Sequence, residues 1–322
     1  FDLFQPFQIK AKEFTMRIIF MGTPDFAVPA LDLLVQNNYH IVGVITATDK
    51  YGGRGGKKLI ESAVKKYAKE EGLHILQPKN LKAPDFLESL RELRADLQIV
   101  VAFRMLPEVV WSMPSKGTFN LHGSLLPAYR GAAPINWAII NGEKETGATT
   151  FFLKHEIDTG DMLYQEHIPI YQSDNAGDVH DRMMLVGAKL VLKTVQAVER
   201  GDYQLQAQDN SKVSKAPKIF RETCQINFDQ ASKKVYDFIR GLSPFPTAWF
   251  LFEEVEMKVY ASKMELEEHN HPSGSMHTDG KNYLKFATTD GYIQLTEVKL
   301  QGRKKMDIKS FLNGYQFTQD NH

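Results

Sequence analysis

The sequence predicts an α/β fold in two domains: a doubly wound N-terminal domain with a mainly parallel sheet, then a small C-terminal β-barrel domain. Three observations lead to this prediction. Between residues 16 and 153, short apolar runs alternate with amphipathic helical patterns, which is typical of a doubly wound domain. The run at 97–102 is almost continuously apolar, as expected for a strand covered on both faces. Beyond residue 248, only short strand patterns separated by turn dipeptides remain.

The elements of the N-terminal domain follow from local patterns. Short apolar runs predict strands at 17–21, 40–47, 74–76, 96–102, 117–121 and 149–153. Apolar residues at helical spacing predict helices between them, at 25–36, 59–71, 84–94 and 134–141. In a Rossmann-like sheet the binding crevice lies at the carboxyl ends of the strands. We therefore expect the segments 22–26, 104–107 and 120–130 to lie near one another at that edge.

A long helix is predicted at 176–199, where apolar residues recur along one face at helical spacing. Asp174 or Asn175 can cap its first turn, because both side chains can accept hydrogen bonds from free backbone N–H groups. Gly201 stands at the position where a glycine commonly ends a helix. The apolar stripe is interpreted as core packing.

The pattern of the chain changes after residue 203. A polar, lysine-rich stretch at 209–221 predicts a connector. It is followed by an amphipathic helix at 230–240 that is expected to end at Gly241, and by strands at 248–252, 256–261, 283–287 and 292–300. Such short strands favour an OB-like barrel. We divide the chain into a non-native or disordered extension at 1–15, a catalytic domain at 16–204, a linker at 205–222 and a C-terminal domain at 223–322.

Composition bounds the classes of function. The 39 basic residues balance the 39 acidic ones, so a nucleic-acid partner would require a local basic patch. Cys224 is the single cysteine, so an internal disulfide and a cysteine-cluster metal site are excluded. A chain without disulfides is typical of the reducing cytoplasm. The histidines lack metal-ligand spacing, so no metal is expected. No apolar run is long enough to predict a membrane span.

The segment 22–26 follows the first strand, where a dinucleotide-binding domain carries its phosphate loop. It lacks the G-x-G-x-x-G spacing, and Pro24 removes a backbone N–H that could bind phosphate. A nicotinamide oxidoreductase is therefore disfavoured. That class stays open as an alternative, together with a non-catalytic RNA-binding protein.

Asn120 and His122 are predicted to end a strand on one side, because alternate residues of an extended chain share a face. Asp158 lies in a turn after another predicted strand and can place a carboxylate at the same edge. An amide, an imidazole and a carboxylate suit a reaction that forms and collapses a tetrahedral oxyanion. A lone histidine at a strand end is usually structural, but the neighbouring Asn120 and the irregular segment after it favour catalysis here.

Four segments carry a resemblance to a known family. Residues 120–131 read NLHGSLLPAYRG, residues 21–27 read MGTPDFA, residues 53–59 read GRGGKKL, and residues 239–246 read IRGLSPFP. With these segments the chain resembles the tetrahydrofolate-dependent formyltransferases, and among them the methionyl-tRNA formyltransferase family, from Met16 almost to the C-terminus. The extra Gly56 and the stretches 104–107 and 154–156 depart from the commoner family pattern.

The resemblance implies transfer of a formyl group from 10-formyltetrahydrofolate to the α-amino group of methionine on initiator tRNA, for translation initiation, by a cytoplasmic monomer. It places the catalytic residues at Asn120, His122 and Asp158. Asn120 and protonated His122 would stabilise the oxyanion, and Asp158 would orient His122 and relay the proton of the amine. The residues expected to bind folate are Arg104, Met105, Leu106, Pro107, Ser124, Leu125, Leu126, Pro127 and Ile157.

The loop at 50–58 is expected to contact the tRNA acceptor. Its four glycines allow it to order on a ligand. Arg54 can bind a phosphate through two parallel hydrogen bonds or reach a base edge. A solvated surface loop is the alternative interpretation. The residues expected to contact tRNA are Lys50, Arg54, Lys57, Lys58, Arg303, Lys304 and Lys305.

Other acceptors within the same chemistry stay open. Glycinamide ribonucleotide formyltransferases are shorter and lack a C-terminal domain. Formyltetrahydrofolate hydrolases and nucleotide-sugar formyltransferases can be as long as this chain, but they do not require the basic loop.

Overall fold

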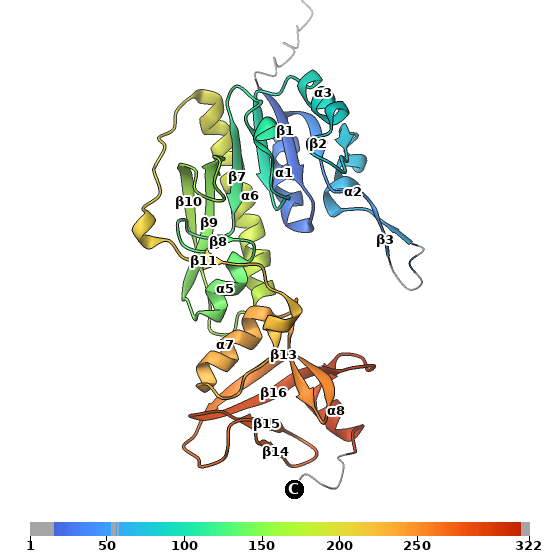
Figure 1. The fold of residues 1–322 in the computed structure, drawn as a ribbon, viewed down its shortest axis with the longest axis vertical. Coiled ribbons are helices and arrows are strands. Elements are labelled where there is room, and N and C mark those ends of the chain that lie inside the picture. Colours follow the sequence, from blue (N-terminus) through green and yellow to red (C-terminus); the bar gives the residue numbers. More distant parts are fainter. Residues whose placement is uncertain (1–15, 53–55, 57, 317–322) are drawn as a thin grey trace, which may run out of the picture. The chain divides into compact units, whose positions relative to one another are not determined.

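The computed structural model describes residues 16–52, 56 and 58–316. The chain forms two compact units, whose helices and strands are labelled in Figure 1. The first contains the residues up to Leu121 together with Val191–Gln204, and the second contains His122–Leu190 together with the residues from Leu205 onward. No helix in the described part of the chain is both long and apolar enough to cross a membrane.

The first unit is built on parallel strands in the order β7-β6-β1-β2-β5. Their bounds are β1 (Arg17–Gly22), β2 (His40–Ile45), β5 (Ile75–Leu76), β6 (Leu97–Val101) and β7 (Thr118–His122). The last residue of β7 already belongs to the second unit. Every residue of β6 is buried, which confirms the prediction of a parallel strand covered on both faces. The helices here are α1 (Val28–Gln36), α2 (Ala63–Glu70), α3 (Pro84–Glu92) and α4 (Glu108–Trp111).

The helix predicted at 59–71 is wrong at its start. Residues Lys58–Ile60 form β4, which pairs with β3 (Lys50–Gly52) in an antiparallel hairpin. The helix begins only at Ala63, because the Ser62 side chain caps it by accepting a hydrogen bond from the Lys65 N–H at 3.0 Å. The ends of the basic loop are thus strands rather than free chain. Arg54 and Lys57 lie outside the described residues.

The second unit opens with an antiparallel pair, β9 (Glu145–Phe152) and β10 (Met162–Pro169), and a short parallel pair, β8 (Arg130–Gly131) and β11 (Lys215–Ala216). Helix α5 (Pro134–Ile140) lies between β8 and β9 in the chain. The long helix α6 (Ala176–Arg200) begins in this unit, its residues from Val191 onward belong to the first unit, and it matches its prediction closely. Asn175 caps it by accepting hydrogen bonds from the backbone N–H groups of residues 177 and 178, and Gly201 follows it with a φ of 68°.

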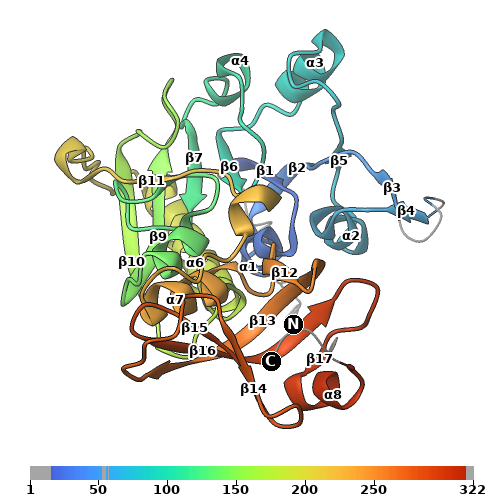
Figure 2. The same cartoon turned by 60° about the horizontal axis from the view of Figure 1, so that its bottom comes forward.

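The C-terminal part of the second unit is an antiparallel sheet in the order β12-β13-β16-β15-β14, with β17 paired to β16 (Figure 2). Its elements are α7 (Ser232–Leu242), β12 (Ala248–Phe252), β13 (Val255–Leu266), β14 (Met276–Thr278), β15 (Leu284–Ala287), β16 (Gly291–Leu300), β17 (Met306–Asp307) and α8 (Ile308–Asn313). Phe228, Phe250 and Phe286 pack together in its core, with ring centroids 4.9–5.4 Å apart. The predicted C-terminal β fold is confirmed, although β13 with 12 residues and β16 with 10 are longer than the short strands expected.

The prediction that the helix before this sheet ends at Gly241 is wrong, because α7 continues to Leu242. Gly241 is instead a point of close approach to α5. A Cβ atom there would lie 2.6 Å from the Ile140 side chain and 3.1 Å from the Asn136 carbonyl oxygen. The Asn136 side-chain amide also donates to the Gly241 carbonyl at 2.8 Å. The glycine therefore serves helix packing rather than helix termination.

Candidate active site

Strand β7 carries the two residues that alternation placed on one face. The backbone of Asn120 pairs with Val100 of β6, which fixes its position in the sheet. Asn120 is half-buried, and among the described residues its side-chain amide has no hydrogen-bond partner. His122, two residues further, is buried. The strand thus holds a free amide and a buried imidazole two residues apart at its carboxyl end.

The contacts of the His122 ring define the role of each nitrogen. Its Nε2 lies 2.9 Å from the carbonyl oxygen of Tyr129. A carbonyl oxygen only accepts hydrogen bonds, so Nε2 carries the proton in this contact. Nδ1 lies 3.8 Å from Oδ2 of Asp158, close to a carboxylate but beyond hydrogen-bond distance. Nδ1 is therefore the nitrogen available to a reactant.

Asp158 occupies a constrained turn. Its φ of 56° lies in the left-handed region, and its Oδ2 accepts a hydrogen bond from the backbone N–H of Gly131 at 2.9 Å. Gly131 itself lies against β11, where a Cβ atom would come within 2.4 Å of the Ala216 carbonyl oxygen. The glycine is thus required for the close approach that brings its N–H to the carboxylate.

Gln208 and Arg130 support the Asp158 turn. The Gln208 side-chain amide donates to the carbonyl oxygens of Asp158 and Gly160, both at 2.8 Å. Its Oε1 accepts from Nε and Nη2 of Arg130 at 3.0 and 2.7 Å. Gly160 completes the turn, because a Cβ atom there would lie only 1.6 Å from the Phe152 carbonyl oxygen. Neither Arg130 nor Gln208 was predicted from the sequence to have a role in the site.

Tyr129 links the His122 contact to a second set of polar groups. Its hydroxyl donates to Glu143 at 2.6 Å and accepts from the Asn141 side chain at 3.3 Å. Burial of the ring, and then the hydrogen bond to Glu143, raise the pKa of Tyr129 to about 12. Its backbone N–H donates to the Ser214 hydroxyl at 2.8 Å. The Tyr129 hydroxyl therefore remains neutral and donates to Glu143. The hydrogen bonds of Tyr129 hold the residue in the position where its carbonyl oxygen meets His122.

The loop after His122 is stabilised by its own polar groups. The Ser124 hydroxyl donates to the Ala128 carbonyl at 2.6 Å, and the Thr149 hydroxyl donates to the Ser124 carbonyl at 2.7 Å. Leu126 is buried against Phe151. Ser124 and Leu126, which were predicted to bind folate, thus have structural contacts within the loop. Leu125 and Pro127 are half-buried.

The remaining residues predicted to bind folate differ in exposure. The Arg104 guanidinium donates to the backbone carbonyls of Pro78 and Lys79 in the first unit. Met105 is 73% exposed, whereas Leu106 is buried and Pro107 precedes α4. In the second unit, Ile157 is 61% exposed beside the Asp158 turn. Met105 and Ile157 are therefore exposed apolar side chains, each of which a bound apolar ligand could bury.

Five of the cationic residues singled out from the sequence are described by the structure, and they lie on two segments. Lys50 and Lys58 are exposed on β3 and β4. On the other segment, Arg303 donates to the Gly314 carbonyl at 3.0 Å and Lys305 pairs with Glu297 at 3.0 Å. Lys304 is exposed and has no partner in the described part of the chain. No set of three His, Cys, Asp or Glu side chains among the described residues could hold a metal ion.

Comparison with known proteins places this site in a family. A family model of the formyl transferase domain matches residues 16–195, and one of the formyl transferase C-terminal domain matches residues 218–316. The chain belongs to the formyl transferase family. The fold and the enzymatic class predicted from the sequence are confirmed by this membership.

Relatives of this formyl transferase are similar over almost their whole length. A protein of Parabacteroides distasonis named methionyl-tRNA formyltransferase is 54% identical over 94% of this chain and 97% of its own. A protein of Flavobacterium johnsoniae with the same name is 49% identical over 95% of this chain and 98% of its own. Among solved structures, an N-formyltransferase of Helicobacter canadensis in complex with folinic acid and dTDP-3-aminofucose has a TM-score of 0.67 at 21% identity, and covers 90% of this chain and 100% of its own.

Proposed function

We propose that this formyl transferase moves the formyl group of 10-formyltetrahydrofolate to the α-amino group of methionyl initiator tRNA, for translation initiation. The observation that carries the proposal is the identity of about half of all residues, over nearly the full chain, with proteins named methionyl-tRNA formyltransferase. In this proposal the enzyme works in the cytoplasm and acts as a monomer.

The geometry of the site supports a direct transfer through a tetrahedral intermediate. The amine of methionine attacks the formyl carbon, a new C–N bond forms, and the carbonyl oxygen becomes negative. The free Asn120 amide and protonated Nδ1 of His122 donate to this oxygen, while Nε2 stays bound to the Tyr129 carbonyl. Asp158, 3.8 Å from Nδ1, takes the proton released by the amine. The negative oxygen then re-forms the carbonyl, the C–N bond to tetrahydrofolate breaks, and the leaving nitrogen takes the proton back from Asp158.

The folate and the acceptor require different surfaces. The pterin needs an apolar wall, for which Ile157 offers an exposed side chain beside the Asp158 turn. The phosphates of tRNA need cations. Lys50 and Lys58 are exposed cations on the β3–β4 hairpin, and Lys304 is an exposed cation near the C-terminus. The other residues predicted from the sequence to bind folate or tRNA stay predictions.

A competition assay tests the proposal. The enzyme receives labelled 10-formyltetrahydrofolate with equal concentrations of methionyl initiator tRNA, glycinamide ribonucleotide and a dTDP-linked aminosugar, and release of free formate measures transfer to water. We expect the label on methionyl-tRNA. Preferential labelling of either small acceptor, or formate as the main product, would overturn the proposal. The proposed monomeric state is tested separately by analytical ultracentrifugation, and sedimentation of the enzyme as a dimer would overturn it.

A further inference from the structure

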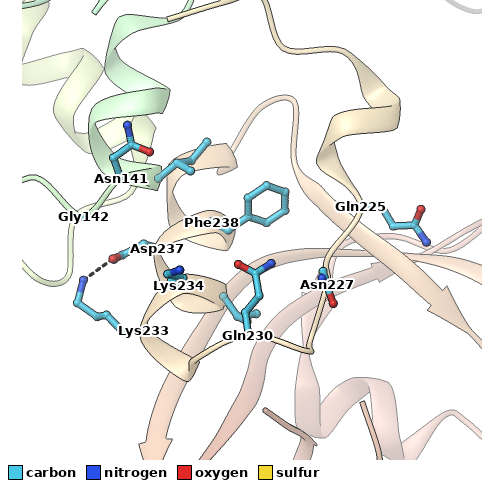
Figure 3. Close-up of a pocket in the computed structure, with 11 residues that line it drawn as sticks. Asn141, Gly142, Gln225, Asn227, Gln230, Lys233, Lys234, Asp237 and Phe238 are labelled. Atoms are coloured by element: carbon cyan, nitrogen blue, oxygen red, sulfur yellow. Dashed lines mark hydrogen bonds and ion pairs between the residues drawn. The ribbon is translucent and has the colours of Figure 1, made fainter. Parts of the chain in front are cut away.

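A cavity of about 700 Å³ lies in the second unit, and its lining contains none of the three candidate catalytic residues (Figure 3). Three segments form it: the end of α5, the chain at 225–230 and the first turns of α7. Its size falls within the range of small-molecule sites, roughly 300–1,000 Å³, and is sufficient for one nucleotide. Nothing in the reaction described above uses it.

The lining of this cavity is rich in amides and lysines. Asn141, Gln225, Asn227 and Gln230 supply amide groups, and Lys233 and Lys234 supply ammonium groups. Asp237 is the one acidic side chain of the lining, and it is bound by Lys233, as Figure 3 shows, and by Arg240 at 2.7 Å. Among the described residues, the side chains of Gln225, Gln230 and Lys234 have no hydrogen-bond or ion-pair partner. These three groups are free for a ligand.

The free groups match one class of ligand. Side-chain amides can both donate to and accept from the edge of a nucleobase. An uncompensated lysine suits a phosphate, and the half-buried ring of Phe238 adds an apolar surface for a base. Unpaired bases are the parts of RNA that proteins read by such contacts, because their edges are accessible.

The cavity is also connected to the candidate catalytic histidine. Asn141, in the cavity lining, donates to the Tyr129 hydroxyl at 3.3 Å. The carbonyl oxygen of the same Tyr129 accepts the Nε2–H of His122 at 2.9 Å. Because Tyr129 is buried, a shift of its ring by a ligand at Asn141 would change the position of its carbonyl oxygen as well.

We propose that this cavity binds one unpaired nucleotide of the RNA substrate, and that Asn141 and Tyr129 couple its occupancy to the orientation of His122. The inference rests on the proposed function, since it takes tRNA as the acceptor. Gln230 and Lys234 bind the base edge and the phosphate, and Asn141 and Tyr129 are positioning residues.

Binding is tested with the double variant Gln230→Ala/Lys234→Ala in the full chain. Lys263→Ala is the matched control, because it removes an exposed lysine of β13 outside the cavity. We expect the Kd for fluorescent initiator tRNA to rise about tenfold in the double variant, as for the loss of a contact to a base edge, and less than twofold in the control. Equal Kd values in the two proteins would overturn the proposal.

A titration with free nucleotides tests the cavity independently of the proposed formyl acceptor. Adenosine, guanosine, cytidine and uridine monophosphates are titrated into the wild-type and double-variant enzymes while the NMR signals of the glutamine side chains are followed. We expect at least one nucleotide to shift the signals of Gln225 and Gln230 in the wild type, and no shift of the remaining Gln225 signals in the variant. Absence of any shift with all four would overturn the cavity as a nucleotide site, whatever the acceptor in the formyl-transfer assay.

Coupling is tested with Tyr129→Phe, which removes only the hydroxyl. At saturating tRNA we expect kcat to fall about tenfold with an unchanged tRNA Kd, and the pH–rate profile to move, because the contact to His122 is altered. A purely structural role would lower the melting temperature without changing the profile. An unchanged kcat and profile would overturn the coupling.

Discussion

His122 donates Nε2–H to a backbone carbonyl, and this contact leaves Nδ1 as the nitrogen that is free for a reactant. The carbonyl belongs to Tyr129, whose backbone lies in the left-handed region with a φ of 59°. A residue other than glycine rarely adopts this conformation, so surrounding contacts must hold it there. The hydrogen bonds of Tyr129 to Ser214 and Glu143 are such contacts. The tautomer of His122 is thus set by residues far from it in the sequence.

Asn120 provides the first test at the residue scale. Because its amide is half-buried and free in the described structure, it is suited to bind an oxyanion rather than to stabilise the fold. Asn120→Ala should lower kcat for methionyl-tRNA by roughly 10²–10³, the usual effect of losing one oxyanion donor. Steady-state kinetics and thermal melting should be measured together. Near-normal kcat, or a fall in melting temperature that accounts for the lost activity, would contradict the assignment.

Gln208 gives a second prediction, because its side chain binds the backbone carbonyls of the Asp158 turn. Gln208→Met keeps the length of the side chain and loses its hydrogen bonds to the turn and to Arg130. Displacement of a catalytic group by about 1 Å can cost up to 10²-fold, so kcat should fall by roughly 10–10² with little change in KM. Gln206→Ala is the control, since Gln206 is exposed and meets Met162 only through its backbone. If both variants retain full kcat, Gln208 does not position Asp158.

The sequence could indicate Asn120 and His122, because strand alternation is a local property. Asp158 was reached through the turn around it and the family resemblance. Gln208 was missed because it lies in a polar stretch that predicts only a connector. Its partner Asp158 is 50 residues earlier in the chain. A contact over such a distance leaves no periodic pattern, so only the folded chain reveals it.

At the scale of elements, prediction succeeded where the pattern was long or fully apolar. The long helix α6 and strand β12 were predicted to within one residue at each end. Strand β10 was missed, since Gln165, Glu166 and His167 interrupt its apolar run. Helix α8 was missed because it spans only 6 residues. Short or polar elements depend on their tertiary partners, and the sequence alone does not reveal those partners.

The contact between α5 and α7 gives a prediction at this scale. In Gly241→Ala the new Cβ would meet the Ile140 side chain at 2.6 Å and Ile140 N at 3.0 Å, so the helices must separate. Overpacking of this kind should lower the free energy of unfolding by about 1–3 kcal/mol. Gly314→Ala is the control, because its Cβ would meet no atom closer than 3.7 Å. Urea unfolding measures the free energy of unfolding of both variants. An equal loss in the two would refute the role of Gly241 in packing α7 against α5.

At the scale of the whole molecule, the formal net charge of zero gives no general attraction to RNA. Binding of tRNA must therefore depend on where the cations lie. Lys50 and Lys58 on one hairpin, and Lys304 near the C-terminus, are exposed and form no ion pair among the described residues. Contacts of this kind should weaken steeply as salt is raised, because each phosphate contact releases bound counterions.

Stability against acid is the last property of the whole molecule that the structure predicts. His277 lies on β14 among His269, His271 and Tyr292, with its ring centroid 4.4 Å from that of His271. Burial, and then the positive charges of His271, Lys285 and His269, lower the pKa of His277. The acidic groups Glu265 and Glu267 of this sheet are paired with Lys285 and do not offset the effect on His277.

A lowered pKa means that the folded protein binds fewer protons than the unfolded chain as pH falls below the ordinary histidine value of about 6.5. The stability that depends on neutral His277 is thus complete above that pH and is lost as pH falls from there to the lowered pKa. His277→Gln should make the free energy of unfolding, measured with urea at pH 7, 6 and 5, decline less steeply than in the wild type. His74→Gln is the control and should leave the slope unchanged, because it removes an exposed histidine that lies outside the cluster and has no side-chain partner among the described residues. A wild-type slope in His277→Gln would show that the histidine cluster does not govern acid stability.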